Sequence, residues 1–345
     1  NSVIVKAHSA HPGTSAFIGS AIMKAAKNTG MPDGVFSLLH GSGKVVGQSL
    51  ISHSGVKAAG FTGSQVAGRI LFDLANQRKE PIPFFAEMGS VNPVLLLPTA
   101  LNLKTVEMLS TSITMGSGQF CTNPGLLLTL ESDLLEQFIN DLGRALEKIE
   151  PGVMLTEKIC KTYYNDVGLS LSNQDVKVES EFQDKNKLNI ASSVLVSVSG
   201  ESFLKNPKLA EEVFGPYSMI VKCKNKDQLN NILTTLNGQL TGTVIGSEDE
   251  MRSFILSINQ LEKKVGRLIF NNVPTGVEVC SSMQHGGPYP ASSDSRFTSV
   301  GTMAIKRFVR PVAFQSWPDS QLPDELKNDN PLNIWRLING EWTMD

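Results

Sequence analysis

The sequence predicts an α/β fold in which part of a parallel, doubly wound sheet is followed by a second α/β domain. Three observations predict it. Short apolar stretches with strand character alternate with apolar residues at helical spacing from the start of the chain. The 345 residues have the length of one large or two ordinary domains. The 41% of hydrophobic residues are enough to build a sizeable core.

The first domain is predicted over residues 1–88. Strand character occurs over residues 3–5, 35–39, 56–61 and 83–87. Helical spacing occurs over residues 12–30, 44–51 and 65–76. Because helices separate the strands, we expect a parallel sheet with right-handed crossover connections.

The same alternation resumes after Pro93 and predicts a second α/β domain over residues 89–285. Its expected strands cover residues 94–97, 126–130, 194–198, 219–223, 242–245 and 268–271. Helices are expected near residues 103–115 and 134–146. From Ser316 the chain is rich in Pro, Asp and Asn, so residues 286–345 are predicted to form a return segment and an extended C-terminal tail.

Composition excludes several classes of protein. The 31 basic and 33 acidic side chains leave a net charge of −2, which gives no attraction to nucleic acid. No apolar run approaches the roughly 20 residues that a membrane span needs. The 4 cysteines are far apart and form no CxxC pair, so we expect a reducing, cytoplasmic location. The 5 histidines show no metal-ligand spacing, so we expect no bound metal.

Two residues predict the chemistry. Glu87 ends a predicted strand, at the edge where α/β enzymes bind ligands. Cys121 follows 34 positions later, at the end of a glycine-loosened turn over residues 116–121, and the pair indicates a nucleophile and a base. An acidic turn covers residues 211–216, and the turn 61–64 leads into a helix N-terminus suited to a pyrophosphate. Taken singly, each feature also has an ordinary structural explanation. A free cysteine, for example, is usually buried and inert.

In this order the motifs resemble the aldehyde dehydrogenase superfamily over nearly the whole chain. The resemblance is carried by Lys6, Phe61–Ser64 with Gly68, Glu87–Pro93, Gly118–Cys121 and Glu212–Pro216. Two further segments, Val5–Ser15 and Gly266–Val277, are similar to the branch that oxidises 2-oxoglutarate semialdehyde (2,5-dioxopentanoate) to 2-oxoglutarate. The resemblance implies that residues 1–88 are the C-terminal part of a dinucleotide-binding domain and that residues 89–285 carry the catalytic thiol.

The resemblance also implies a mechanism. Cys121 attacks the aldehyde as a thiolate, the thiohemiacetal loses a hydride to the nicotinamide, and water activated by Glu87 hydrolyses the thioester. A free thiol is only about 3% ionised at pH 7, so the site must favour the anion. A carboxyl that acts as this base needs a pKa raised toward neutrality by partial burial. Glu87 argues against the coenzyme A-acylating branch, which stays an alternative, as does a non-catalytic scaffold.

Seven residues are implied to bind the cofactor: Lys6, Ser9, Gly63, Ser64, Gly68, Glu212 and Phe214. Glu212 would hold the nicotinamide ribose hydroxyls, and Phe214 would brace the ring. Lys6 can bond the adenine ribose or a phosphate on it. Ser9 stands where NAD-preferring relatives often carry an acid, so nothing there repels a 2′-phosphate. NADP is therefore the expected cofactor, with NAD tolerated.

Substrate and assembly are also expectations from the resemblance. A semialdehyde with a distal carboxylate needs a cation or donors at the tunnel mouth, and the candidates are Arg296 and the polar pair of Gln284 and His285. Complete members of the superfamily carry an N-terminal portion that includes an oxyanion-hole Asn, and this portion lies outside these residues. We therefore expect a longer natural protein and weak catalysis from this chain alone, because losing one such donor costs on the order of 10² to 10³ in rate. A homo-oligomer, dimer or tetramer, is expected.

Overall fold

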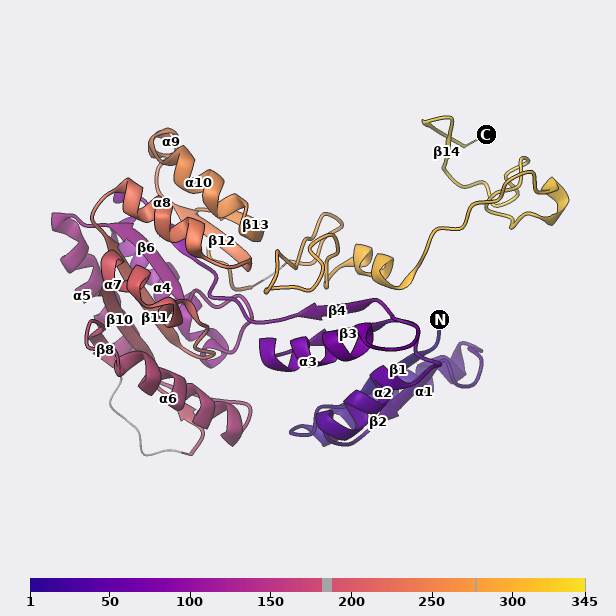
Figure 1. Ribbon diagram of the computed structural model, residues 1–345, viewed down its shortest axis with the longest axis horizontal. Helices are drawn as coiled ribbons and strands as arrows, with labels where there is room; N and C mark the ends of the chain where they lie inside the picture. Colours follow the sequence, from indigo (N-terminus) through magenta and orange to yellow (C-terminus); the bar gives the residue numbers. More distant parts are fainter. Residues whose placement is uncertain (182–187, 277, 345) are drawn as a thin grey trace. The chain divides into compact units, whose positions relative to one another are not determined.

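The computed structural model describes residues 1–181, 188–276 and 278–344 (Figure 1). The chain divides into a main unit, Asn1–Arg307, and a small unit, Phe308–Asp345. Among the described helices, none combines the length and the apolar character that crossing a membrane requires.

The main unit begins with two separate pairs of parallel strands. β1 (Val3–Lys6) pairs with β2 (Phe36–Leu39), and β3 (Ala59–Thr62) pairs with β4 (Phe84–Glu87). The helical segments between them are α1 (Pro12–Asn28), η1 (Gly43–Gly47, a π-helical turn), α2 (Gln48–Ser52) and α3 (Gln65–Asn76). The alternation is as predicted, but within the described residues the pairs form two sheets instead of one. Apolar periodicity marks a strand and carries no information on which strand edges pair.

A sheet of 7 strands forms the rest of the main unit, in the order β13-β12-β5-β6-β11-β10-β8. Its strands are β5 (Val94–Leu96), β6 (Leu126–Leu130), β8 (Lys177–Glu181), β10 (Val194–Ser199), β11 (Tyr217–Cys223), β12 (Gln239–Ile245) and β13 (Val265–Phe270). The pairs are parallel except for antiparallel β8 and β10. β8 was not among the expected strands, because its residues are mostly polar.

Helices bury both faces of this sheet, which explains why its strands are almost continuously apolar. The helices are α4 (Leu103–Thr114), α5 (Asp133–Glu147), α6 (Glu157–Leu171), α7 (Gly200–Lys205), α8 (Lys226–Thr235), α9 (Glu248–Met251) and α10 (Ile255–Glu262) (Figure 1). Leu127 packs in one core cluster with α4 and α5, whereas its neighbours Leu126 and Leu128 pack in the other with α6, α8 and α10. Successive strand residues point to opposite faces, so one strand serves both clusters.

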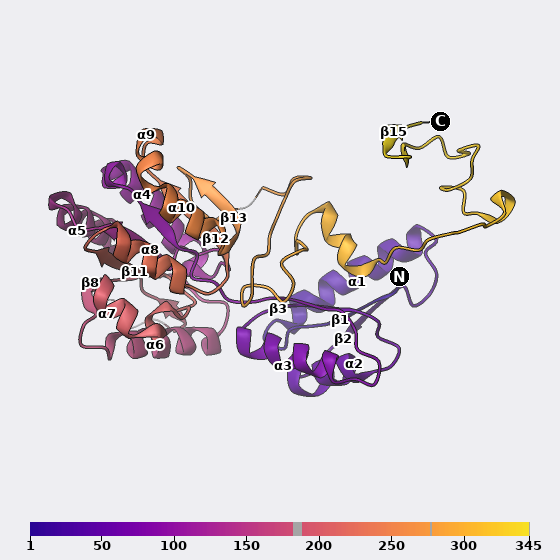
Figure 2. The same cartoon turned by 45° about the horizontal axis from the view of Figure 1, so that its top comes forward.

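Short elements complete the fold. In the main unit these are the antiparallel pair β7 (Gly152–Val153) and β9 (Ile190–Ala191) and the 3₁₀ turns η2 (Pro98–Ala100), η3 (Met115–Gly118), η4 (Pro207–Ala210) and η5 (Arg252–Phe254). The turn η6 (Thr302–Phe308) ends at the start of the small unit. The small unit contains η7 (Asp319–Gln321) and the antiparallel strands β14 (Arg336–Ile338) and β15 (Glu341–Thr343), with the rest irregular (Figure 2).

One irregular segment, residues 285–299, runs along β4 and connects distant parts of the chain. The Met88 N–H donates to the Ala291 carbonyl at 2.8 Å, and the Ser293 N–H donates to the Ala86 carbonyl at 2.9 Å. An isolated antiparallel bridge joins Glu87 to Ser292. These backbone bonds place residues 291–293 beside the carboxyl end of β4.

Candidate active site

A left-handed turn delivers Cys121 to the surface of the main unit. Helix α4 ends at Thr114, and Gly116, Ser117 and Gly118 follow with φ of 56°, 57° and 65°. A side chain at Gly118 would strike the backbone of residues 215–216, so only glycine allows this close approach. The turn leaves the Cys121 thiol half-buried, while Gly118 packs against residues 215–216 of the acidic turn.

Asn92 fixes the Cys121 loop to the sheet. Its own φ of 47° is left-handed, a conformation that Asn tolerates better than most residues. Its Nδ2 donates to the carbonyls of Cys121 and Asn123, each at 2.9 Å. Its Oδ1 accepts from the hydroxyls of Ser90 and Thr241, each at 2.9 Å. A fully bonded amide in the core therefore sets the position of the thiol.

Cys121, Glu87 and His285 form one cluster. The Sγ of Cys121 lies 3.4 Å from Nε2 of His285, and the same nitrogen lies 3.2 Å from Oε1 of Glu87. The three functional groups lie within 4.8 Å of one another. Glu87 is 6% exposed and His285 is 5% exposed, whereas Cys121 is half-buried. The structure thus joins the two residues predicted to be catalytic and adds a buried imidazole between them.

The charges in this cluster stabilise one another. Hydrogen bonds with Cys121 and Glu87 outweigh burial and raise the pKa of His285 to about 9. Burial raises the pKa of Glu87, but the hydrogen bonds and charge of His285, with the hydroxyl of Ser299 and the thiol, outweigh it and leave that pKa below its ordinary value. The raised pKa expected for Glu87 is therefore not found in this arrangement, because an imidazole pairs with the carboxylate.

These groups provide the donor types of a metal site as well as those of a nucleophile site. Thiolate, imidazole and carboxylate are all zinc ligands. The expectation that no histidine has a metal-ligand arrangement came from sequence spacing, and it does not describe His285, which lies 164 residues from Cys121 in the chain. Spacing along a sequence does not detect side chains that meet only through tertiary contacts.

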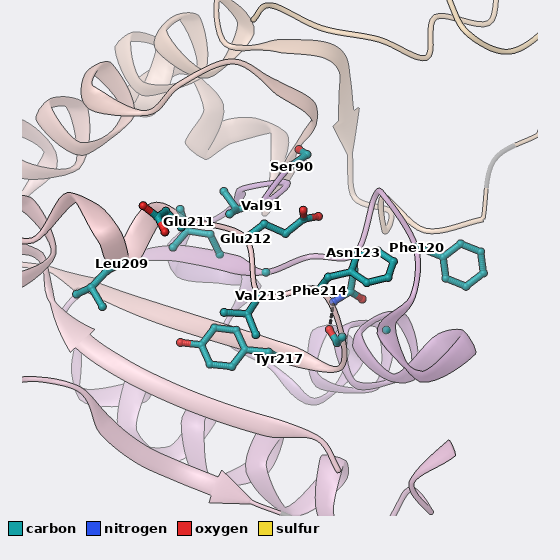
Figure 3. A pocket seen from close by; sticks show the side chains of 14 residues that line it. Ser90, Val91, Phe120, Asn123, Leu209, Glu211, Glu212, Val213, Phe214 and Tyr217 are labelled. Atoms are coloured by element: carbon teal, nitrogen blue, oxygen red, sulfur yellow. Dashed lines mark hydrogen bonds between the residues drawn. The ribbon is translucent and has the colours of Figure 1, made fainter. Parts of the chain in front are cut away.

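A pocket beside the Cys121 loop contains Glu212 and Phe214 (Figure 3). Gly118, Phe120 and Asn123, which flank the cysteine, line the same pocket. The carboxylate of Glu212 points toward Ser90, whereas that of Glu211 points away (Figure 3). Burial raises the pKa of Glu212 to about 7, partly offset by a hydrogen bond that its carboxylate accepts from the Ser90 N–H. A carboxyl held in this way can accept hydrogen bonds from ligand hydroxyls.

The other predicted cofactor residues lie at the ends of β1 and β3. Lys6 ends β1, and Ser9 is exposed in the turn that follows. Ser64 caps α3, and its Oγ accepts from the Ala67 N–H at 3.4 Å. Gly63 donates its N–H to the Glu87 carbonyl at 3.1 Å, which ties this turn to the end of β4. A side chain at Gly68 would collide with Met88, so glycine allows α3 to pack closely on the end of β4.

The two predicted substrate residues occupy different surroundings. The guanidinium of Arg296 is 80% exposed and binds Asp294 at 2.6 Å. Gln284 is half-buried, and its Nε2 donates to the Phe297 carbonyl at 3.5 Å.

Two other arginine side chains interact electrostatically with members of the Cys121–Glu87–His285 cluster. Arg267 interacts electrostatically with Cys121, and Arg307 does so with Glu87. The Nε of Arg267 is buried without a hydrogen-bond partner in the described structure. Burial lowers the pKa of both side chains.

The sequence does not predict the roles of two residues of this site. Asn92 stands inside the motif Glu87–Pro93, and its position before Pro93 at the start of a buried strand is its only local signal. The sequence marks His285 only as part of a polar pair with Gln284 at the expected tunnel mouth. No signal in the sequence links it to Cys121, because their contact depends on the path of the segment along β4.

Comparison with known proteins is consistent with this site. The sequence profile of the aldehyde dehydrogenase family matches residues 1–299. Alpha-ketoglutaric semialdehyde dehydrogenase 2 of Azospirillum brasilense is 46% identical over 343 residues, which cover 98% of this chain and 65% of that protein. Alpha-ketoglutaric semialdehyde dehydrogenase of Acinetobacter baylyi is 44% identical over 348 residues, covering 100% of this chain and 66% of that protein. The chain thus spans about two-thirds of the length of these relatives.

Solved structures share the fold. Glyceraldehyde-3-phosphate dehydrogenase GapN of Methanocaldococcus jannaschii, complexed with NADP, superposes with a TM-score of 0.71 at 20% identity, over 85% of this chain and 62% of that one. Proline utilization A of Bdellovibrio bacteriovorus superposes with a TM-score of 0.75 at 23% identity, over 90% of this chain and 32% of that one. These likenesses confirm the α/β fold class.

Proposed function

Because the chain belongs to the aldehyde dehydrogenase family, we propose that its site oxidises an aldehyde to an acid through a covalent intermediate on Cys121. One observation carries the proposal. A half-buried thiol lies within 4.8 Å of a buried carboxylate and a buried imidazole, beside a pocket that contains Glu212. This arrangement supplies a nucleophile, a base and a place for a second ligand.

Cys121 and Glu87 act in different steps of the proposed reaction. The Cys121 sulfur attacks the carbonyl carbon, and the carbonyl electron pair moves to oxygen, where the backbone N–H of Cys121 can stabilise it. The chemistry that a bound nicotinamide dinucleotide supplies is a hydride acceptor. Cys121 then holds the acyl group as a thioester. Glu87 takes a proton from water, the water oxygen bonds to the acyl carbon, and the carbon–sulfur bond breaks to return the thiolate.

The residues present fit a dinucleotide. Helix α3 begins beside the Ser64 turn with its first N–H groups pointing out of the helix, as a pyrophosphate site needs. The Glu212 carboxylate fits ribose hydroxyls, and Phe214 gives a flat apolar surface in the same pocket. Lys6 and the absence of an acid at Ser9 favour NADP over NAD, since no carboxylate there repels a 2′-phosphate.

For the substrate we propose an aldehyde with a distal carboxylate, namely 2-oxoglutarate semialdehyde. The relatives at 46% and 44% identity carry that substrate in their names. The buried, unpartnered Nε of Arg267 and its electrostatic interaction with Cys121 make it a better candidate for the distal carboxylate than Arg296, which is exposed and already bound by Asp294.

Trapping the intermediate tests the reaction. The chain is mixed with aldehyde and NADP, the reaction is quenched in acid, and the masses of the digested peptides are measured by mass spectrometry. Glu87→Gln slows hydrolysis, so we expect an acyl group on the Cys121 peptide that Cys121→Ser lacks. Cys280→Ser, at an exposed cysteine, is the matched control and keeps the adduct. No adduct on Cys121 in Glu87→Gln would refute the proposal and favour a scaffold, and turnover that requires coenzyme A would favour the acylating alternative.

Initial rates test the two finer points. The chain is assayed with short aldehydes that have or lack a far-end carboxylate, in NAD and in NADP. We expect faster turnover with the carboxylate and with NADP. Arg267→Gln raises KM at least about tenfold for the acidic aldehyde, which corresponds to loss of one charge-assisted contact of about 1.4 kcal/mol, and leaves the neutral aldehyde unchanged. Equal effects on both aldehydes would exclude Arg267 as the carboxylate ligand.

A further inference from the structure

We propose that His285 is a further catalytic residue, which takes the thiol proton of Cys121 and holds the sulfur as a thiolate. The inference rests on the proposed function, because it concerns the nucleophile of that reaction. Its starting point is the 3.4 Å distance between Sγ and Nε2, across which an N–H can point directly at the sulfur.

The hydrogen-bonding pattern of the imidazole supports an ion pair. Nε2 faces both the Cys121 sulfur and, at 3.2 Å, the Glu87 carboxylate. A proton on this nitrogen therefore lies between two groups that carry negative charge when ionised. Nδ1 is buried and has no hydrogen-bond partner among the described residues. The two acceptors beside Nε2 favour a proton on that nitrogen, whereas an Nδ1–H without an acceptor opposes the charged ring.

Glu87 is a poorer acceptor for the thiol proton than His285. The carboxylate already receives hydrogen bonds from His285 and from the Ser299 hydroxyl. These bonds hold the pKa of Glu87 below its ordinary value, whereas the pKa of His285 is raised to about 9. Of these two groups, the imidazole is therefore the one that accepts the proton from the thiol. Glu87 remains ionised and available for the water of the second half-reaction.

The transfer balances without any further reactant. The S–H bond breaks, an N–H bond forms at Nε2, and the total charge of the cluster is unchanged. Other charged groups face the cluster from the neighbouring elements. Arg267 of β13 interacts with Cys121, Arg307 of η6 interacts with Glu87, and Asp294 lines a pocket that His285 also lines. Both guanidiniums favour the ionised sulfur and carboxylate, whereas Asp294 is paired with Arg296.

The backbone keeps the ring in place. The His285 N–H donates to Oγ1 of Thr298 at 2.9 Å, and the His285 carbonyl accepts from the Ser299 N–H at 2.8 Å. The Ser299 hydroxyl contacts both the His285 carbonyl and the Glu87 carboxylate. One serine thus links the backbone that carries the imidazole to the carboxylate that pairs with it.

The test is the pH dependence of Cys121 alkylation in the full chain. Iodoacetamide is applied between about pH 5 and pH 10, with chelator and without aldehyde or cofactor, and each cysteine is quantified in digests. Because thiolates of lower pKa are also weaker nucleophiles, the readout is the pH at which the rate is half-maximal, not the rate at one pH. Exposed Cys280 is the reference thiol in the same samples.

We expect the half-maximal pH for Cys121 to lie at least one unit below that for Cys280, and His285→Gln to remove this difference. His40→Gln, at an exposed histidine, leaves it unchanged. Glu87→Gln keeps part of the difference, because the imidazole is still present but has lost one of its two acceptors. Coinciding curves for the wild type and His285→Gln would overturn the proposal.

Two further results separate this inference from the proposed function. If His285→Gln does not fold, the ultraviolet absorbance of the thiolate is measured in the wild type, with Cys121→Ser as the blank. We expect this absorbance to be present already near pH 6. Its first appearance above about pH 8 would overturn the inference. Early alkylation without any acyl adduct would refute only aldehyde oxidation. An adduct that forms equally well in His285→Gln, with unchanged alkylation, would refute only the role of His285.

Discussion

Replacing Asn92 by alanine should destabilise the main unit and release the Cys121 loop. The change removes amide donors to the carbonyls of Cys121 and Asn123 and the acceptor for the hydroxyls of Ser90 and Thr241. Each buried hydrogen bond contributes about 1 kcal/mol, and alanine at a φ of 47° adds about 1 kcal/mol of strain. Because part of the lost bonding is recovered by relaxation, we expect a loss of about 3 kcal/mol in the free energy of unfolding.

Urea denaturation measures this loss, with Asn102→Ala as the matched control. Asn102 is exposed and caps α4 by accepting from the Thr105 N–H at 3.1 Å, so its replacement should cost about 1 kcal/mol. Asn92→Gly keeps the backbone conformation and should recover about 1 kcal/mol relative to alanine. Only the Asn92 variants should change the alkylation rate of Cys121. A cost for Asn92→Ala no larger than that for Asn102→Ala would refute the view that this amide fixes the nucleophile.

Three further predictions concern pH, packing and cofactor choice. The pKa of His285 is raised to about 9 in the folded protein, so the imidazole contributes at most about 3 kcal/mol to the free energy of unfolding. This contribution is complete below about pH 6.5 and is lost as the pH rises through 9. Unfolding measured at several pH values should therefore show a decline that His285→Gln abolishes. Gly118→Ala should cost about 2 kcal/mol or more in unfolding free energy, since its Cβ would meet the backbone of residues 215–216, whereas Gly13→Ala, with nothing within 4 Å, should be nearly neutral. Ser9→Asp should lower the NADP-to-NAD ratio of kcat/KM by about tenfold, because a carboxylate there repels a 2′-phosphate, and an unchanged ratio would place that phosphate elsewhere.

The local spacing of residues predicted most elements of the fold correctly. Helix α3 spans residues 65–76 and strand β6 spans residues 126–130, as the apolar periodicity predicts. The amphipathic helix α5 buries Leu135, Phe138, Ile139, Leu142 and Leu146 on one face. The sequence predicts these elements because buried side chains recur about every 3.6 residues in a helix and every 2 residues in a strand, so a short stretch of sequence is enough to distinguish them.

Glu87 and Cys121 could also be found from the sequence, because each stands in a short motif at the end of an element. What only the tertiary structure decided is which groups surround them. His285 lies 164 residues beyond Cys121, and hydrogen bonds between its segment and β4 bring the two within 3.4 Å. The same holds for Arg296, which is exposed, and for Arg267, which interacts electrostatically with the thiol. Proximity between distant segments depends on which backbone edges pair, and no local pattern of side chains encodes that choice.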